Sequence, residues 1–363
     1  MNKNLTNKLT FLVLLKERRE FTLRFFEFLK KTKFPFKVFF SDGSKKKLPH
    51  EFFERLKSSN INYTYKKFPH DKNYATFQKK VLDSIKLIKT EYICFFSDDD
   101  FPIINSYKKL IKFLEKNNSY VACGGYAINF DLFKKFFNPN NVYGHPINFQ
   151  KIMFKSSNNH KNKFKRLEHY LNNMENTWYC VFRRKVLLEN FKLINKNKIY
   201  FKNLNFYYYV HDAVNYISGK IKKLSIITLL HQYHLNSEIN TFLKKDELVD
   251  NKYFNSDIMK FHKKLYKTFF NDKKRDLKLI IHNYFFTKKI RVSNVLYTKS
   301  ILNKCRKKFK ISNKNIIYLV YNFFLYHFMK IKNTHVTNFI NKIKNKTVKK
   351  ELISIISLLN RHY

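Results

Sequence analysis

Short, almost continuous apolar runs alternate with amphipathic segments in the first hundred residues. Such runs are typical of buried parallel strands, and the segments between them repeat apolar residues at helical spacing. Strands are predicted at Leu9–Leu15, Phe36–Phe40, Ile61–Tyr65 and Tyr92–Phe96. Helices are predicted around Phe21–Leu29, at Pro49–Leu56 and at Tyr74–Ile88. Repeated strand–helix units predict an α/β fold whose mostly parallel sheet is flanked by helices.

The pattern is less regular in the next hundred residues. The polar stretch Gly144–Glu175 is interpreted as a loop or as a helical insertion, because its periodicity is weak. A strand at Thr177–Phe182, a helix at Leu204–Ser218 and a strand at Leu224–Leu230 follow. The 5 glycines and 6 prolines all lie in the first 219 residues, so the chain beyond residue 236 is expected to be helical. We therefore predict an α/β domain at 1–235 and a basic, all-helical domain at 236–363.

Composition restricts the class of protein. Hydrophobic residues make up 44% of the 363 residues, which excludes a disordered chain and allows a sizeable core. The 73 Lys and Arg against 26 Asp and Glu give a formal charge of +47. This excess favours anionic partners such as nucleic acid, a membrane surface or phosphorylated substrates. An AT-rich genome would also produce this abundance of Lys, Asn, Phe, Ile and Tyr, so charge alone does not identify a partner.

Cysteine spacing and the apolar segments bear on location. The 4 cysteines form no C-x-x-C pair, and a chain of this length needs no disulfides, so a reducing, cytoplasmic location is expected. No signal peptide is expected, because Thr10–Leu15 is short and charges follow it at once. Ile316–Met329 is shorter than the roughly 20 residues that cross a bilayer. It is interpreted as a core helix or as a peripheral contact with the inner face of an anionic membrane.

Three adjacent carboxylates, Asp98–Asp100, follow the apolar run Tyr92–Phe96. Like charges this close repel and raise one another's pKa, and a divalent cation removes that cost. Oxygen ligands suit Mg²⁺ or Mn²⁺, which in turn suits a diphosphate. The alternative is an acidic turn that caps the next helix. Asp42 follows another predicted strand and should lie at the same edge, where ligands bind in parallel sheets.

Several motifs now form one ordered pattern. They are Asp42-Gly43-Ser44, Asp98-Asp99-Asp100-Phe101, His211-Asp212 and Gly219. Their order resembles the family 2 glycosyltransferases, and within them a branch with a triple-aspartate–phenylalanine motif. The resemblance implies a GT-A fold, which is a Rossmann-like sheet that binds a nucleotide-sugar donor, here expected to be a UDP-sugar. It also implies hexosyltransferase-like transfer to a hydroxyl of a glycan or a lipid-linked acceptor, as in polysaccharide biosynthesis.

The resemblance assigns the nucleotide site. Asp42 would contact the nucleotide base, and a carboxylate can accept the imide N–H of uracil. Arg18 lies in the segment that matches the first nucleotide loop of the family. Lys16-Glu17 departs from the common pattern there.

The resemblance also assigns roles to a metal and to the aspartates Asp98–Asp100, which we call the acid cluster. Asp98 and Asp99 would contact the donor, and Asp99 or Asp100 would ligate Mn²⁺ or Mg²⁺ in the manner of a DXD motif. The metal would neutralise the charge that builds on the leaving diphosphate. His234 is a further candidate metal ligand.

The general base is assigned by the same resemblance. Asp212 occupies the place of the second acid of the family's Glu-Asp motif, which is the usual base in inverting members. His211 replaces the glutamate of that motif, and Glu175 is a second candidate base. Trp178 and Tyr179 are interpreted as a stacking floor for an acceptor sugar or as core residues.

A function of another class is the alternative. The basic, aromatic composition also suits a nucleic-acid-binding protein or a metal-dependent nucleotidyltransferase. No helix-turn-helix, zinc-finger or RNA-binding signature occurs in the sequence. Two-metal chemistry usually needs more converging acids than Asp42 and Asp212 would add to the cluster. A glycosyltransferase is therefore the first hypothesis.

Overall fold

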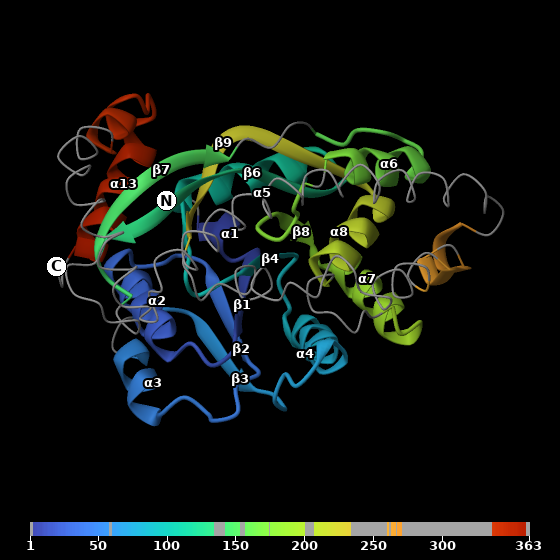
Figure 1. Cartoon of the computed structure of the whole chain (residues 1–363), viewed down its shortest axis with the longest axis horizontal. Coiled ribbons are helices and arrows are strands. Elements are labelled where there is room, and N and C mark those ends of the chain that lie inside the picture. Colours follow the sequence, from blue (N-terminus) through green and yellow to red (C-terminus); the bar gives the residue numbers. More distant parts are fainter. Residues whose placement is uncertain are drawn as a thin grey trace, which may run out of the picture.

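A single mixed sheet with helices on both faces organises the protein (Figure 1). The computed structural model describes residues 3–57, 60–133, 142–152, 157–173, 175–199, 207–233, 260, 263–265, 267–270 and 336–360. The strands run in the order β3-β2-β1-β4-β8-β6-β9-β5, and β7 pairs with β6. Their bounds are β1 Leu9–Leu15, β2 Lys37–Asp42, β3 Tyr63–Lys67, β4 Tyr92–Phe96, β5 Phe101–Pro102, β6 Tyr120–Phe133, β7 His145–Ile152, β8 Val181–Arg183 and β9 Lys220–Gln232.

The first four strands are mutually parallel, as the sequence predicts. The central strands β1 and β4 are buried almost throughout, whereas the edge strand β3 alternates between half-buried and exposed residues. Strand β6 is parallel to β9, and β8 runs antiparallel to both β4 and β6. The carboxyl ends of β1, β2 and β4 therefore meet at one edge of the sheet, which we call the carboxyl edge.

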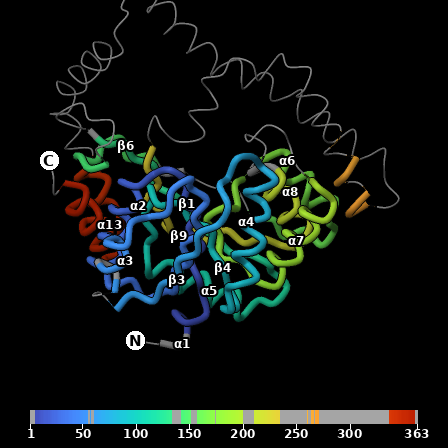
Figure 2. The backbone as a smooth tube through the Cα atoms, turned by 90° about the horizontal axis from the view of Figure 1, so that it is seen from below, coloured from blue at the N-terminus to red at the C-terminus, as the bar shows by residue number. Residues whose placement is uncertain are grey.

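Helices cover the sheet as two groups that follow the two core clusters (Figure 2). One cluster packs α2, α3, α5 and α13, and the other packs α4, α6, α7 and α8. Each helix turns an apolar face to the sheet; in α2, for example, Phe25, Phe28 and Leu29 are buried. The helices are α1 Lys3–Thr6, α2 Arg19–Lys31, α3 His50–Lys57, α4 Tyr74–Leu87, α5 Ile104–Lys116, α6 Lys163–Asn173, α7 Arg184–Lys196, α8 Tyr207–Ser218 and α13 Lys346–Leu359.

The polar stretch Gly144–Glu175 contains both β7 and α6, so neither a plain loop nor a helical insertion describes it. The long strand β6 is not predicted from the sequence, and it contains Gly124 and Gly125. A Cβ on Gly125 would lie 2.4 Å from the carbonyl oxygen of Ile226 on β9. Glycine therefore serves here for close approach of two backbones rather than for a turn.

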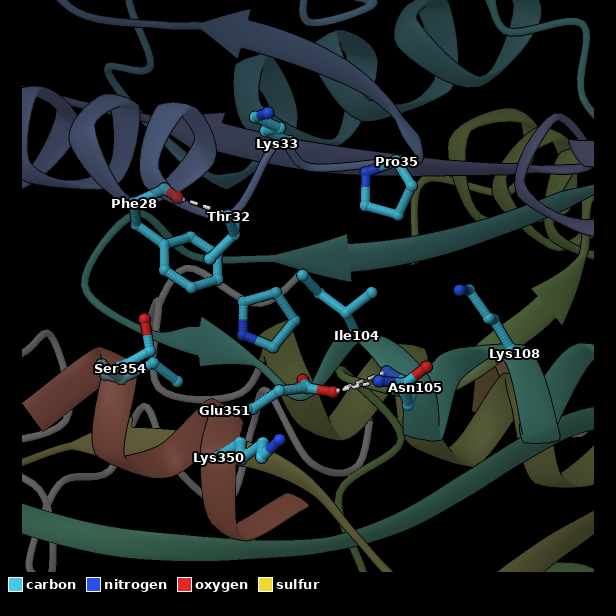
Figure 3. A pocket seen from close by; sticks show the side chains of 12 residues that line it. Phe28, Thr32, Lys33, Pro35, Ile104, Asn105, Lys108, Lys350, Glu351 and Ser354 are labelled. Carbon is cyan, nitrogen blue, oxygen red and sulfur yellow. Dashed lines mark hydrogen bonds between the residues drawn. The ribbon is translucent and has the colours of Figure 1, made fainter. Parts of the chain in front are cut away.

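The C-terminal helix α13 lies beside β7 (Figure 1). Its buried residues belong to the same core cluster as those of β1. Its residue Glu351 accepts hydrogen bonds from the backbone and side-chain nitrogens of Asn105 at the start of α5 (Figure 3). The cap residue of α5, Ile103, has no polar side chain, so Glu351 satisfies this helix end from outside. A cavity of about 320 Å³ lies beside this contact, and its lining includes Phe28, Pro102, Glu351 and Ser354.

The predicted helical domain at 236–363 falls mostly outside the described residues and stays a prediction, as does the role of Ile316–Met329. Its described parts include the helix α13. Within the part of the chain that the structure describes, no helix is both long and apolar enough to cross a membrane.

Candidate active site

Arg18 sits at the carboxyl edge and bridges two aspartates of the acid cluster. Its guanidinium donates to Asp98 Oδ1 at 2.5 Å and to Asp99 Oδ2 at 2.6 Å. Thr22 on α2 donates to the second oxygen of Asp98 at 2.7 Å. Burial raises the pKa of Asp98, and the charge of Arg18 works against that rise. Part of the like-charge repulsion that the sequence predicts is thus relieved by an arginine.

Asp100 is held by a second set of partners, which strand pairing brings to it. Phe101 of β5 pairs with Leu230 of β9, so the residues just outside that pair, Asp100 and His231, become neighbours. His231 Nδ1 lies 2.9 Å from Asp100 Oδ1, and the backbone N–H of Gln232 donates to the same oxygen at 2.9 Å. Burial alone would lower the pKa of His231, but the Asp100 carboxylate raises it to about 9.

Tyr179 is the third partner of Asp100 and donates to its Oδ2 at 2.5 Å. It lies just before β8, whose antiparallel register pairs Cys94 with Val181. The segment that enters β8 therefore passes the carboxyl end of β4. We call residues 176–180 the entry segment.

The buried guanidinium of Arg24 holds the backbone of the acid cluster. It donates to the Asp99 carbonyl at 2.8 Å, to Gln232 Oε1 at 2.6 Å and to the Val142 carbonyl at 2.5 Å. Burial lowers the pKa of Arg24 to about 10, which leaves it charged at neutral pH. The side chain thus fixes the backbone of the acid cluster against the end of β9.

Asp42 ends β2 and is fully buried. It accepts a hydrogen bond from the Ser44 backbone N–H at 2.8 Å and one from the Tyr65 hydroxyl at 2.5 Å. The loops that follow β1 and β2 are also joined, because the backbone N–H of Glu17 donates to Ser44 Oγ at 2.9 Å. The Asp-Gly-Ser motif therefore forms a turn that is tied to the loop carrying Arg18.

A buried ion pair lies behind that turn. Lys80 on α4 contacts Asp71 at 2.5 Å, and both side chains are 2% exposed. Burial raises the pKa of Asp71 and lowers that of Lys80, while the contact between them opposes both shifts. A Cβ on Gly43 would lie 2.2 Å from the Asp71 carboxylate, so only glycine fits at this point of the turn.

Replacing Lys80 with methionine should destabilise the fold by about 3–5 kcal/mol, because it leaves the Asp71 charge buried without its partner. The free energy of unfolding from urea titration would measure this. Lys79→Met is the matched control: Lys79 is the exposed neighbour and pairs with Asp83 on the helix surface, so its loss should cost less than about 1 kcal/mol. Equal losses in the two variants would contradict a structural role for the buried pair.

Asp212 lies on α8 and is 5% exposed. Its Oδ1 accepts from the Thr177 backbone N–H at 2.9 Å and from the Thr177 hydroxyl at 2.5 Å. Burial raises the pKa of Asp212 to about 7, against the lowering effect of these two bonds. The entry segment therefore contacts Asp212 through Thr177 and Asp100 through Tyr179.

Residues 11–191 match the family model described as glycosyl transferase family 2. The chain belongs to this family. The match covers β1 to α7 and therefore includes Asp42 and the acid cluster. No curated protein sequence matches the chain.

A solved structure of S. aureus TarS shares the fold of this family 2 protein. TarS 1-349 in complex with UDP-GlcNAc superposes with a TM-score of 0.50 at 13% identity, covering 77% of this chain and 71% of that chain. A further TarS structure gives a TM-score of 0.45 at 13% identity and covers 77% of this chain, which spans 43% of that TarS chain. The predicted α/β fold of GT-A type is confirmed.

The family 2 assignment favours the glycosyltransferase hypothesis over the nucleic-acid-binding or nucleotidyl-transfer alternative. It does not test the triple-aspartate–phenylalanine branch, which stays a prediction. The individual site residues also stay predictions, although the structure gathers Arg18, Asp42 and the acid cluster at one edge.

Three residues considered for the site are buried in the core: His211, Trp178 and Glu175. His211 is 2% exposed and stacks parallel to Trp178 with ring centres 5.9 Å apart; burial lowers its pKa to about 3. Trp178 also stacks on Phe95, so it is a core residue rather than a floor for an acceptor sugar. Glu175 is buried and accepts from the Tyr216 hydroxyl at 3.4 Å. His234 lies outside the described residues.

The acid cluster has the donor chemistry of a divalent cation site, because carboxylate oxygens suit Mg²⁺ and Mn²⁺. Among the described residues, no group of three His, Cys, Asp or Glu side chains is already arranged around one point in that way. The oxygens of Asp99 accept from Arg18 and those of Asp100 from His231 and Tyr179. Each carboxylate oxygen has two lone pairs, so a metal would either share these oxygens with the donors or displace one of them.

Several residues around the site are not predicted from the sequence. Thr177 is predicted only as the first residue of a strand, and His231 is not among the predicted site residues. Lys80 and Arg24 read as ordinary helix positions. A lysine or arginine on the apolar face of a helix is an available signal, because such a charge is rarely buried without a partner.

Proposed function

We propose that this protein transfers a sugar from a UDP-sugar to a hydroxyl of a glycan or a lipid-linked acceptor, with inversion and with Asp212 as the general base. The observation that carries the proposal is the buried Asp212 carboxylate, which the entry segment joins to the acid cluster. Burial also raises the pKa of Asp212 to about 7. A base whose pKa lies near the operating pH is best suited to accept a hydroxyl proton.

The reaction follows from these groups. The acceptor oxygen attacks the anomeric carbon while its proton passes to a carboxylate oxygen of Asp212. The bond between that carbon and the donor diphosphate breaks, and UDP leaves with the electron pair. One carboxylate oxygen of Asp212 is already held by Thr177, so the proton would be taken by the other.

The nucleotide and the metal have separate places in the proposal. Asp42 and Arg18 would bind the nucleotide, and Asp98 and Asp99 the sugar-phosphate side of the donor. A Mn²⁺ or Mg²⁺ ion held by Asp99 or Asp100 would supply positive charge to the leaving diphosphate. The UDP-GlcNAc complex of TarS, a protein of the same fold, supports a uridine nucleotide as the donor class.

A thermal-shift screen of UDP-, GDP- and CMP-sugars, with and without Mn²⁺, tests the proposal. We expect the melting temperature to rise with UDP-sugars and to rise further with Mn²⁺, because a ligand that binds only the folded state stabilises it. If none of these sugars raised the melting temperature, with or without Mn²⁺, that result would contradict the proposal. Release of UDP from the active donor then provides an assay of turnover. The hexosyl type and the peripheral membrane contact stay predictions.

A further inference from the structure

A chain of buried hydrogen bonds ends on Asp212. Asn190 Nδ2 donates to Asn215 Oδ1 at 2.9 Å. Ser218 Oγ lies 2.7 Å from Asn190 Oδ1 and 2.8 Å from the Val214 carbonyl, so its one proton has two acceptors and the chain is traced from Asn190. Asn215 Nδ2 then donates to Thr177 Oγ1 at 3.1 Å, and the Thr177 hydroxyl donates to Asp212 Oδ1. The chain crosses from α7 to α8 and reaches the entry segment.

From Asn190 onward, every bond in this chain points toward the carboxylate. Because Asn215 Nδ2 is a donor only, it occupies a lone pair of the Thr177 oxygen and leaves the hydroxyl proton to be donated onward. That proton has the Asp212 carboxylate as its acceptor. Hydrogen bonds aligned in this way polarise one another, most strongly where water is excluded, and Asn190, Asn215 and Thr177 are each at most 3% exposed.

We propose that Thr177, oriented by Asn215, is the positioning residue that holds one carboxylate oxygen of Asp212 and so presents the other to the acceptor hydroxyl. This inference rests on the proposed function, since it takes Asp212 as the base. The backbone N–H of Thr177 donates to the same oxygen, so the carboxylate is held by two donors from one residue. A carboxylate fixed at one oxygen loses rotational freedom before the substrate arrives, which favours a reactive geometry.

Other groups also face Asp212 and remain in place when Thr177 changes. Lys223 on β9 lowers the pKa of Asp212, and the Cys180 thiol and the Tyr216 hydroxyl lie within its electrostatic reach. Glu175 faces Tyr216. Since these groups are unchanged by a Thr177 substitution, a change in the pKa of Asp212 would report on the hydroxyl.

The test is the pKa of Asp212, measured by ¹³C NMR of the full chain labelled at aspartate carboxyl carbons, with Asp212→Asn to assign the signal. Thr177→Val removes the hydroxyl donor at constant shape and should raise this pKa by about one unit. Thr177→Ser keeps the hydroxyl and should leave the pKa as in the wild type. Thr90→Val is the matched control, because Thr90 is also buried but bonds Thr10 and the Tyr92 carbonyl.

Asn215→Leu tests whether Asn215 acts through Thr177. It should raise the pKa of Asp212 in the same direction, and the double variant with Thr177→Val should show no larger rise than Thr177→Val alone, because the two share one path. If the valine variant does not fold, Asn215→Leu carries the test by itself. An unchanged pKa in Thr177→Val, or in Asn215→Leu where only that variant folds, would overturn the proposal, and so would additive rises in the double variant.

A second readout separates this inference from the proposed function. The pH profile of UDP release should shift with the NMR pKa in Thr177→Val and should be restored in Thr177→Ser. If Asp212→Asn retains turnover, the base assignment fails whatever the NMR titration shows. If Asp212→Asn is inactive and the pKa in Thr177→Val is unchanged, the base stands and the positioning role of Thr177 fails.

Discussion

Asp212→Asn is expected to lower the rate of UDP release at least about 100-fold while the affinity for UDP stays unchanged. The asparagine amide has the same shape and can still accept from Thr177, but it cannot take a proton from an acceptor hydroxyl. Turnover with the donor found in the thermal-shift screen, together with calorimetric titration of UDP, would measure both quantities. Near-normal turnover would exclude Asp212 as the base.

Glu175→Gln is the matched control for this variant, because Glu175 is the second candidate base and is also 5% exposed. Its turnover should stay within about tenfold of the wild type, since the loss of a base costs more than that. A large loss of turnover in Glu175→Gln with little loss in Asp212→Asn would identify Glu175, and not Asp212, as the general base.

Asp212→Asn should also have a higher free energy of unfolding than the wild type at alkaline pH. The folded pKa of Asp212, about 7, lies above the ordinary value of 3.8, so the folded state holds this proton more tightly than the unfolded chain. Wild-type stability therefore falls as pH rises from about 4 to about 7, and the deficit persists at higher pH. The asparagine variant has no such deficit, and thermal unfolding at pH values on both sides of this range would show it.

Asp100→Asn is expected to reduce the Mn²⁺-dependent part of UDP affinity at least about 100-fold, if Asp100 is the direct ligand, because even the loss of a residue that only supports a metal ligand costs about 10- to 100-fold. Asp99→Asn is the alternative, since either carboxylate can hold the ion. Calorimetric titration of UDP with and without Mn²⁺ would rank the two. Unchanged metal-dependent affinity in both variants would remove the metal site from the proposal.

Two further aspartates serve as controls for this experiment. Asp98 is held by Arg18 and Thr22 and is not one of the proposed metal ligands, so Asp98→Asn should lower the free energy of unfolding more than the metal dependence of UDP binding. Asp83 pairs with Lys79 on the outer surface of α4, and Asp83→Asn should change neither quantity. This comparison separates loss of a ligand from general damage to the acid cluster.

The repeated strand–helix units were predictable because their signal is local. Leu9–Leu15 is apolar except for Thr10, and Tyr92–Phe96 is apolar throughout, as expected of strands buried on both faces; both occur as predicted. Strand β6 was not predicted, because Gly124 and Gly125 interrupt its pattern, and their fit depends on Cys180 and on β9 respectively. Local periodicity in the sequence does not predict which distant strand packs against a given residue.

Part of the candidate site followed from the same local signal. Acids placed directly after parallel strands must meet at the carboxyl edge, and Asp42 and Asp98–Asp100 do so. The contacts of those acids could not be predicted, because Arg18 and Tyr179 reach them from 80 and 79 residues away in the chain. Likewise, nothing local distinguishes His211, which lies in the core, from Asp212 beside it.

The sequence by itself determined which strands form the parallel half of the sheet and where its acids would gather, because burial and strand direction follow from residue order. The tertiary structure alone decided how each acid is held. The pairing of Phe101 with Leu230 brings His231 to Asp100, and the entry segment brings Thr177 to Asp212. The charge state of a buried carboxylate depends on such neighbours, and these are set by packing between distant segments.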